Sequence, residues 1–290
     1  MNQITVGAAT VTRIEESYEP NFEARTFFAD WRPETAEQHR DWLAPNHYDP
    51  ASGYLKLSVH SWLIRLGGRS ILIDACVGNH KPRPARPQWH MLETRYLDRL
   101  AAAGARPEEI DMVMCTHLHV DHVGWNTRID NGRWVPTFPN ARYLFGRTDY
   151  EHFLKVDQSE KGPANHGSFR DSVLPVVEAG LAQMVDGGAV DEHLSIEPAP
   201  GHTPGHVVFK LASNGKEAMF CGDVLHHLIQ LYHPDWNSFA CLDGTAARTS
   251  RRRLLEYCAG SGALLTPGHF GAPFVCHVDA HGDAFRPRLG

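Results

Sequence analysis

The chain of 290 residues has a formal net charge of −6, with 21% charged and 42% hydrophobic residues. This length is enough for one large α/β domain with a full core, and the proportions are those of ordinary globular proteins. Because a nucleic-acid-binding protein normally carries a basic surface, the net charge argues against a nucleic-acid partner. The six cysteines form no CxxC pair, which indicates buried thiols in a reducing compartment rather than a disulfide framework.

No apolar segment typical of a signal peptide follows Met1, and no apolar run is long enough to cross a bilayer. We therefore expect a cytoplasmic protein with no membrane partner. The unusual count is that of histidine, with nineteen residues, many of them beside glycine, proline or aspartate. This enrichment points toward metal chemistry.

The first predicted element is a strand over residues 4–14, where apolar and polar residues alternate loosely. Residues 15–53 follow, a segment rich in aromatic residues, proline and charge, with no clear periodicity apart from a short helix at 39–43. A segment of this length is typical of a lid, an oligomer contact or a substrate wall. Its aromatic side chains could equally form local core, and both interpretations stay open.

Two strands, 58–66 and 70–74, are joined by Gly67-Gly68, which is a hairpin signal. A proline-rich loop at 81–87 precedes a predicted helix at 91–104. The next element is a short apolar strand at 110–115, whose composition suits a buried position.

The densest group of candidate metal ligands follows this strand directly, in the run Thr116-His117-Leu118-His119-Val120-Asp121-His122-Val123-Gly124. His117 and His119 would leave the strand on the same side, because side chains alternate along a strand. Asp121 and His122 would follow in a tight turn near Gly124. Such spacing allows one backbone segment to supply ligands to two adjacent metal ions.

The remaining chain alternates between short strands and helices. We predict a strand at 142–145, helices at 148–156 (capped by Thr148) and 171–180, strands near 183–185, 194–198, 206–211 and 217–221, a helix at 245–257 and a last strand at 263–266. The strands fall into two groups, each with helices between or after them. This pattern favours two β-sheets packed together with helices outside, in one domain.

Three later strand ends also place a ligand-type residue beside a glycine: Gly201-His202, Gly222-Asp223 and Gly268-His269. Loops at strand ends are where rigid scaffolds commonly carry functional residues. Each of these fragments is weak evidence alone, since an aspartate after glycine is usually a turn residue. Together with the 117–122 run they indicate a composite metal site.

This order of motifs resembles the metallo-β-lactamase superfamily of metal-dependent hydrolases, over about 58–270. The resemblance implies a single α/β domain over 1–290, a four-layer αβ/βα sandwich with the metal site at one edge of its two sheets. It implies that His117, His119 and His202 hold one metal ion, that Asp121, His122 and His269 hold a second, and that Asp223 bridges both.

Imidazole and carboxylate ligands suit two divalent ions, zinc above all, with iron, manganese or cobalt as alternatives. Two such ions can share a hydroxide at neutral pH, which attacks a carbonyl or phosphoryl centre. Asp121 is then a candidate proton carrier, together with metal-bound water. Histidine ligands need neighbours that fix their tautomers, and Asp74, at the end of an apolar strand, is our candidate.

Within the superfamily the chain resembles the N-acyl homoserine lactone lactonases and related esterases. This implies a dinuclear-metal hydrolase acting on a lactone or carboxylic ester of a small molecule. The aromatic residues in the loops flanking the ligands indicate either a substrate with an apolar portion or ordinary loop packing; they are Trp89, Trp125, Phe138, Trp236 and Phe239. The lactonases have a tyrosine three residues after the bridging aspartate, whereas this chain has His226 there, followed by His227. Either histidine could donate to an oxyanion, and we include His226 with Asp121 and Asp223 as the catalytic candidates.

Other functions stay open. They are phosphotriester or thioester hydrolysis by the same fold, a mononuclear-iron sulfur dioxygenase, and a metal-binding protein without hydrolytic activity. The 15–53 segment would serve as a lid or as a dimer arm, so a homodimer is a further prediction.

Overall fold

The structure is a computed structural model that describes residues 3–289 and contains two compact units. Residues 3–17 and 59–187 form one, called here the N-unit. Residues 18–58 and 188–289 form the other, the C-unit. Among the described residues, no helix combines the length and apolar character needed to cross a membrane.

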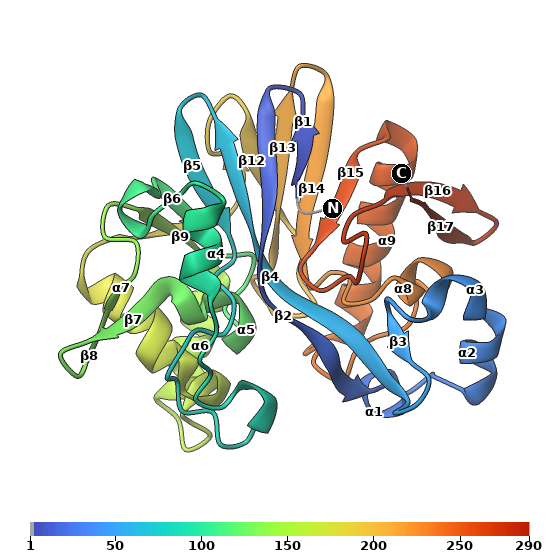
Figure 1. The fold of residues 1–290 in the computed structure, drawn as a ribbon, viewed down its shortest axis with the longest axis horizontal. Helices are drawn as coiled ribbons and strands as arrows, with labels where there is room; N and C mark the ends of the chain where they lie inside the picture. Colours follow the sequence, from blue (N-terminus) through green and yellow to red (C-terminus); the bar gives the residue numbers. More distant parts are fainter. Residues whose placement is uncertain (1–2, 290) are drawn as a thin grey trace. The chain divides into compact units, whose positions relative to one another are not determined.

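The larger sheet has eight strands in the order β1-β2-β4-β5-β6-β9-β10, with β3 pairing with β4 (Figure 1). Most of it lies in the N-unit, and β2 and β4 continue along the chain into the C-unit. Its strands are β1 (Gln3–Val6), β2 (Ala9–Glu23), β3 (Tyr48–Asp49), β4 (Tyr54–Leu66), β5 (Arg69–Ile73), β6 (Met112–Met114), β9 (Arg142–Gly146) and β10 (Ala182–Val185).

The strand expected at 4–14 is in fact two strands, β1 and β2, joined by a tight turn. Gly7 adopts a φ of 60°, a left-handed conformation that favours glycine, and Val6 pairs back with Ala9. β2 then continues to Glu23, so the start of the predicted 15–53 insertion is regular strand. The Gly67-Gly68 hairpin between β4 and β5 is confirmed, with φ values of 61° and 79°.

Parallel pairing places the first candidate ligands at one edge of this sheet. β5 pairs with β6 in parallel, with Ile73 opposite Met114. Asp74 and Cys115 therefore leave the sheet side by side, and the backbone N–H of Asp74 donates to the carbonyl of Met114 at 3.0 Å. This register brings Asp74 close to the segment that carries His117.

The N-unit also contains short helices and a small hairpin, and α6 packs against β9 and β10. Contrary to the sequence analysis, Asp121 and His122 lie in a short helix, α5, rather than in a turn. Thr148 does not cap its helix, because α6 already begins at Arg147 and Gly146 occupies the N-cap. The elements are η1 (Pro87–Trp89), α4 (Tyr96–Ala102), η2 (Pro107–Glu109), α5 (Val120–Val123), η3 (Gly124–Asn126), β7 (Thr127–Asp130), β8 (Arg133–Pro136), α6 (Arg147–Asp157), η4 (Ala164–Gly167), the π-helix η5 (Phe169–Val173) and α7 (Leu174–Glu178).

The C-unit is built on a five-stranded sheet in the order β11-β12-β13-β14-β15. β14 and β15 run parallel, with Gly222 opposite Pro267, so Asp223 and the Gly268-His269 pair follow at the same edge. A two-stranded hairpin, β16-β17, follows later in the chain. The strands are β11 (Gly188–Ala189), β12 (Leu194–Pro198), β13 (Val207–Ser213), β14 (Lys216–Gly222), β15 (Leu264–Pro267), β16 (His277–His281) and β17 (Ala284–Arg288).

The helices of the C-unit are α1 (Ala24–Phe27), α2 (Pro33–Gln38), α3 (Arg40–Leu43), α8 (Ile229–Tyr232) and α9 (Gly244–Ser261). α9 is longer than the predicted 245–257. Its N-terminus is capped by the Asp243 carboxylate, which accepts from the N–H groups of Thr245 and Ala246, both at 3.0 Å. It ends at Ser261, and the next residue, Gly262, has a φ of 73°, the left-handed conformation common after a helix.

The aromatic segment before β4 is packed into the C-unit. Phe27, Phe28 and Trp31 are buried in one apolar cluster with Leu57 and Ile229. These side chains are therefore local core. The predicted role of the segment as a lid or dimer arm stays a prediction.

Candidate metal-binding residues

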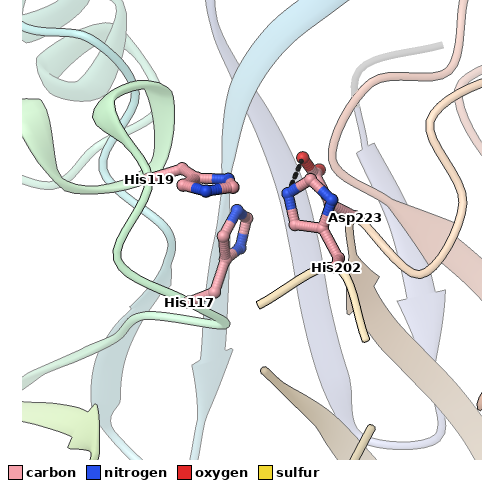
Figure 2. A group of neighbouring side chains, drawn as sticks. All are labelled: His117, His119, His202 and Asp223. Atoms are coloured by element: carbon pink, nitrogen blue, oxygen red, sulfur yellow. Dashed lines mark ion pairs between the residues drawn. The ribbon is translucent and has the colours of Figure 1, made fainter. Parts of the chain in front are cut away.

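Three histidines converge in the N-unit at the end of β6. The ring centroid of His117 lies 4.7 Å from that of His119 and 4.1 Å from that of His122. His117 and His122 are buried and His119 is half-buried. Figure 2 shows His117 and His119 rising from the same loop with their rings adjacent. Asp121 extends this group, with its Oδ2 atom 3.9 Å from Nε2 of His122.

Asp74 holds this group of histidines through Nδ1 of His122, as the sequence analysis expected. Its Oδ2 atom lies 2.9 Å from Nδ1 of His122, and its Oδ1 atom accepts the backbone N–H of Thr116 at 2.7 Å. The Thr116 hydroxyl in turn lies 3.1 Å from Nδ1 of His117. When Nδ1 is held in this way, the Nε2 atom is the one available to a metal ion.

In the C-unit, three histidines surround one carboxylate. Oδ2 of Asp223 lies 3.1 Å from Nε2 of His202 and 3.2 Å from Nε2 of His226. Oδ1 lies 3.0 Å from Nε2 of His269. All four side chains are buried, and Figure 2 marks the contact between His202 and Asp223.

In the C-unit, too, neighbouring groups hold the Nδ1 atoms of the candidate ligands. Nδ1 of His269 lies 2.8 Å from the carbonyl oxygen of Ser58, and Nδ1 of His202 lies 3.8 Å from the Cys241 sulfur. The backbone N–H of Asp223 donates to Nε2 of His206 at 3.1 Å. Because Nδ1 of His202 and Nδ1 of His269 are engaged in this way, the Nε2 atom of each ring is the one available to a metal ion, as in the N-unit.

The electrostatics of the C-unit group match a site for a cation. Burial would lower the pKa of His202, but the adjacent Asp223 carboxylate raises it to about 9. Burial lowers the pKa of His226 to about 3, although Asp223 opposes that shift. Both rings thus feel the negative charge of the buried Asp223 carboxylate, and a divalent ion would be attracted by the same charge.

The donor sets in both units fit a divalent metal ion. Each unit offers imidazole nitrogens and carboxylate oxygens held in buried positions, which suits zinc, iron, manganese or cobalt. All seven residues predicted as ligands belong to these groups: His117, His119, Asp121 and His122 in the N-unit, and His202, Asp223 and His269 in the C-unit.

The structure distinguishes between the two adjacent candidates His226 and His227. His226 faces Asp223, whereas both ring nitrogens of His227 are engaged elsewhere. Nε2 of His227 lies 2.9 Å from the carbonyl oxygen of His47, and its Nδ1 atom accepts the backbone N–H of Ile229 at 3.1 Å. His226 is therefore the histidine of this pair that belongs to the candidate site.

Sequence reasoning missed several supporting residues. Thr116 could have been found, because a hydroxyl residue directly before His117 is a natural partner for its ring. The Ser58 carbonyl and the Cys241 thiol carry no signal in the sequence, because both are brought to their histidines by tertiary packing.

A sequence profile of the Metallo-beta-lactamase superfamily matches residues 55–269. The chain therefore belongs to this superfamily, whose members are metal-dependent hydrolases, and it has the metallo-β-lactamase fold. The predicted family and fold class are confirmed.

Among curated proteins, the chain is 32% identical over 167 residues to a hydroxyacylglutathione hydrolase of Aeromonas hydrophila. That match covers 57% of this chain and 45% of the relative, so the chain spans less than half of the relative's length. It is also 27% identical over 219 residues to the N-acyl homoserine lactonase AttM of Agrobacterium fabrum. The AttM match covers 70% of this chain and 75% of that protein.

Among solved structures, the hydrolase AbOPH of the beta-lactamase superfamily aligns with a TM-score of 0.83 and 23% identity, covering 99% of this chain and 97% of that one. AidC, a dizinc quorum-quenching lactonase in complex with a product, aligns with a TM-score of 0.79 and 20% identity, covering 99% and 96%. At these identities the likeness is one of fold.

Proposed function

We propose that the chain is a dinuclear-metal hydrolase that cleaves a lactone or a carboxylic ester. The observation that carries the proposal is the set of seven ligand-type side chains, all buried or half-buried, in which four of the five imidazoles have Nδ1 held by a neighbour. A purely structural site would need fewer ligands and no open position for water.

In this proposal the two units act as one functional domain. His117, His119 and His202 would hold one ion, Asp121, His122 and His269 the other, and Asp223 would contact both. Two zinc ions, or iron, manganese or cobalt in their place, would supply a hydroxide at neutral pH and polarise the substrate carbonyl. The lactonase AidC is described as a dizinc enzyme, which supports a two-ion centre here.

The residues of the chain would then move the protons. Asp121 is the proposed carrier of the proton that leaves the attacking water. His226 is the proposed donor to the substrate oxygen, since its Nε2 atom is directed toward Asp223 at 3.2 Å. Binding of cations by Asp223 would leave the Nε2–H group of His226 available to an oxyanion.

An aromatic cluster beside His226, with Phe239 at its exposed end, supports a substrate with an apolar portion. The ring of Phe27 packs edge-on against His226 with centroids 5.5 Å apart, and Phe239 packs on Phe27 at the same distance. Phe22 contacts both phenylalanines, and Phe239 is 48% exposed. An acyl or aryl group could cover the exposed ring of Phe239 while its carbonyl lies at His226.

Thioester hydrolysis is the second candidate function, because the Aeromonas hydroxyacylglutathione hydrolase has the higher identity. We favour the lactone or ester because the AttM match extends over more of both chains. The test is a panel of a lactone, an aryl ester, a thioester and a phosphotriester, assayed with the zinc-loaded protein and with Asp223→Asn. Lactone or ester turnover that Asp223→Asn abolishes would support the proposal, whereas exclusive cleavage of the thioester or the phosphotriester would overturn it.

We further propose that the protein acts in the cytoplasm and forms a homodimer through the aromatic segment before β4. All six cysteines are free thiols, which suits a reducing compartment. Sedimentation analysis would test the dimer, and a monomer at micromolar concentration would contradict it.

A further inference from the structure

Five side chains of the C-unit form a closed ring of polar contacts that includes a cysteine. Nδ1 of His202 lies 3.8 Å from Sγ of Cys241, which lies 3.6 Å from Oγ of Ser238. Oγ of Ser238 lies 3.3 Å from Nε2 of His226, and both His226 and His202 contact Asp223 through Nε2. The ring of contacts thus links Nδ1 of His202, a proposed ligand, to His226, the proposed donor to the substrate oxygen.

The backbone holds the cysteine against His202. The N–H of Leu242 donates to the carbonyl of His202 at 3.1 Å, and the N–H of Asp243 donates to the carbonyl of Gly201 at 2.8 Å. The N–H of Cys241 itself donates to the carbonyl of Ser238 at 3.2 Å. These bonds fix the backbone of residues 241–243 beside residues 201–202, and so place the Cys241 side chain next to the His202 ring.

Cys241 differs from the cysteines of the apolar core in its surroundings. Its sulfur has two polar partners, Nδ1 of His202 and Oγ of Ser238. Cys221, Cys258 and Cys276, by contrast, lie together in one apolar core cluster of the C-unit.

We propose that Cys241, supported by Ser238, is a positioning residue that orients His202 for metal binding. The inference rests on the proposed function, because it assigns His202 to a metal ion. The sulfur would accept the Nδ1–H group of His202 and so fix the tautomer that leaves the Nε2 lone pair for the ion. The Ser238 hydroxyl would hold the sulfur from its other side.

The test measures zinc affinity of the full chain by competition with a chromogenic chelator, for wild type, Cys241→Ala and Cys241→Ser. Leu242→Ala is the matched control, because Leu242 is the next residue and its side chain is 58% exposed. We expect Cys241→Ala to weaken binding of one ion by about 10–100-fold, the range typical for partners of metal-ligating histidines. The hydroxyl of Cys241→Ser should limit the loss to less than about tenfold, and Leu242→Ala should bind as wild type.

Affinity within twofold of wild type for Cys241→Ala would overturn the inference. So would equal losses in Cys241→Ala and Cys241→Ser, since that result indicates packing alone. If Cys241→Ala fails to fold, Cys241→Val takes its place, because it also removes the polar partner of Nδ1, and an affinity within twofold of wild type in that variant would overturn the proposal. Wild-type protein that binds no zinc would instead contradict the proposed function, so the two failures are distinguishable.

Discussion

Oδ2 of Asp74 lies 2.9 Å from Nδ1 of His122, and both side chains are buried in the N-unit. A carboxylate in this position fixes the ring of a metal-ligating histidine and increases its basicity. The relationship therefore extends the proposed metal centre beyond its ligands, and it can be tested without any knowledge of the substrate.

Asp74→Asn should weaken zinc binding by about 10–100-fold, because the amide is a poorer partner for the Nδ1–H group. The measurement is titration of the metal-free protein with zinc. Asp111→Asn is the control, since Asp111 also accepts a backbone N–H, from Ser70 at 2.8 Å, but lies near the start of β6 rather than near the histidines. Equal affinity in Asp74→Asn and Asp111→Asn would argue against the role given to Asp74.

His226→Phe should lower kcat by about 10²–10³-fold while the protein keeps its full metal content, as expected for loss of a hydrogen-bond donor to the oxyanion. His227→Phe is the paired comparison, because His227 is the adjacent residue and engages His47 and Ile229 instead. That variant should lose stability but keep kcat near the wild-type value. A His226→Phe enzyme with unchanged kcat would remove His226 from the catalytic residues.

The stability of the metal-free protein should fall as the pH decreases from about 6.5 to about 4. Burial lowers the pKa of His47 to about 3 and that of His227 to about 4, and the two rings lie 5.7 Å apart. In the unfolded chain histidine titrates near 6.5, so over this pH range the unfolded state binds more protons. Each histidine should reduce the free energy of unfolding by about 2 kcal/mol at pH 5, relative to pH 7.5.

Urea unfolding at pH 7.5 and pH 5, in the presence of a chelator, measures this change. His47→Phe should show a smaller difference between the two pH values than wild type. A wild-type protein whose stability is the same at both pH values would contradict the burial of neutral histidines.

Asp171→Asn should destabilise the protein by about 3–5 kcal/mol, because it leaves buried cations without their counter-charge. Both amino groups of the Arg83 guanidinium contact the Asp171 carboxylate, at 2.6 and 2.7 Å, and the Lys81 ammonium lies 3.4 Å from the same carboxylate. Asp186→Asn is the control, since its pair with Arg147 is exposed and should contribute little. Thermal unfolding compares the two variants, and equal midpoints would contradict the prediction.

The sequence was most informative where function is encoded locally. His117, His119, Asp121 and His122 fall within one short run, so their grouping in the N-unit needed no knowledge of the tertiary structure. Asp74 could be anticipated because it ends an apolar strand, and parallel pairing of β5 with β6 then brings it to His122.

Features that depend on distant packing were not predictable. The contacts of Cys241 with His202 and of Ser58 with His269 join residues far apart in the chain. The turn at Gly7 was missed because the alternating pattern continues through it, and only a positive φ divides the strand. The sequence predicts a turn at Asp121 and His122, where the structure has α5, because a single helical turn has no periodicity to detect.

The most direct test of the central claim is the number of zinc ions that the metal-free chain binds at saturation, measured by equilibrium dialysis and elemental analysis. The account predicts two ions per chain, and clearly fewer for Asp223→Asn, since that side chain is proposed to contact both. Saturation of the wild-type chain at one ion, or unchanged occupancy in Asp223→Asn, would contradict it.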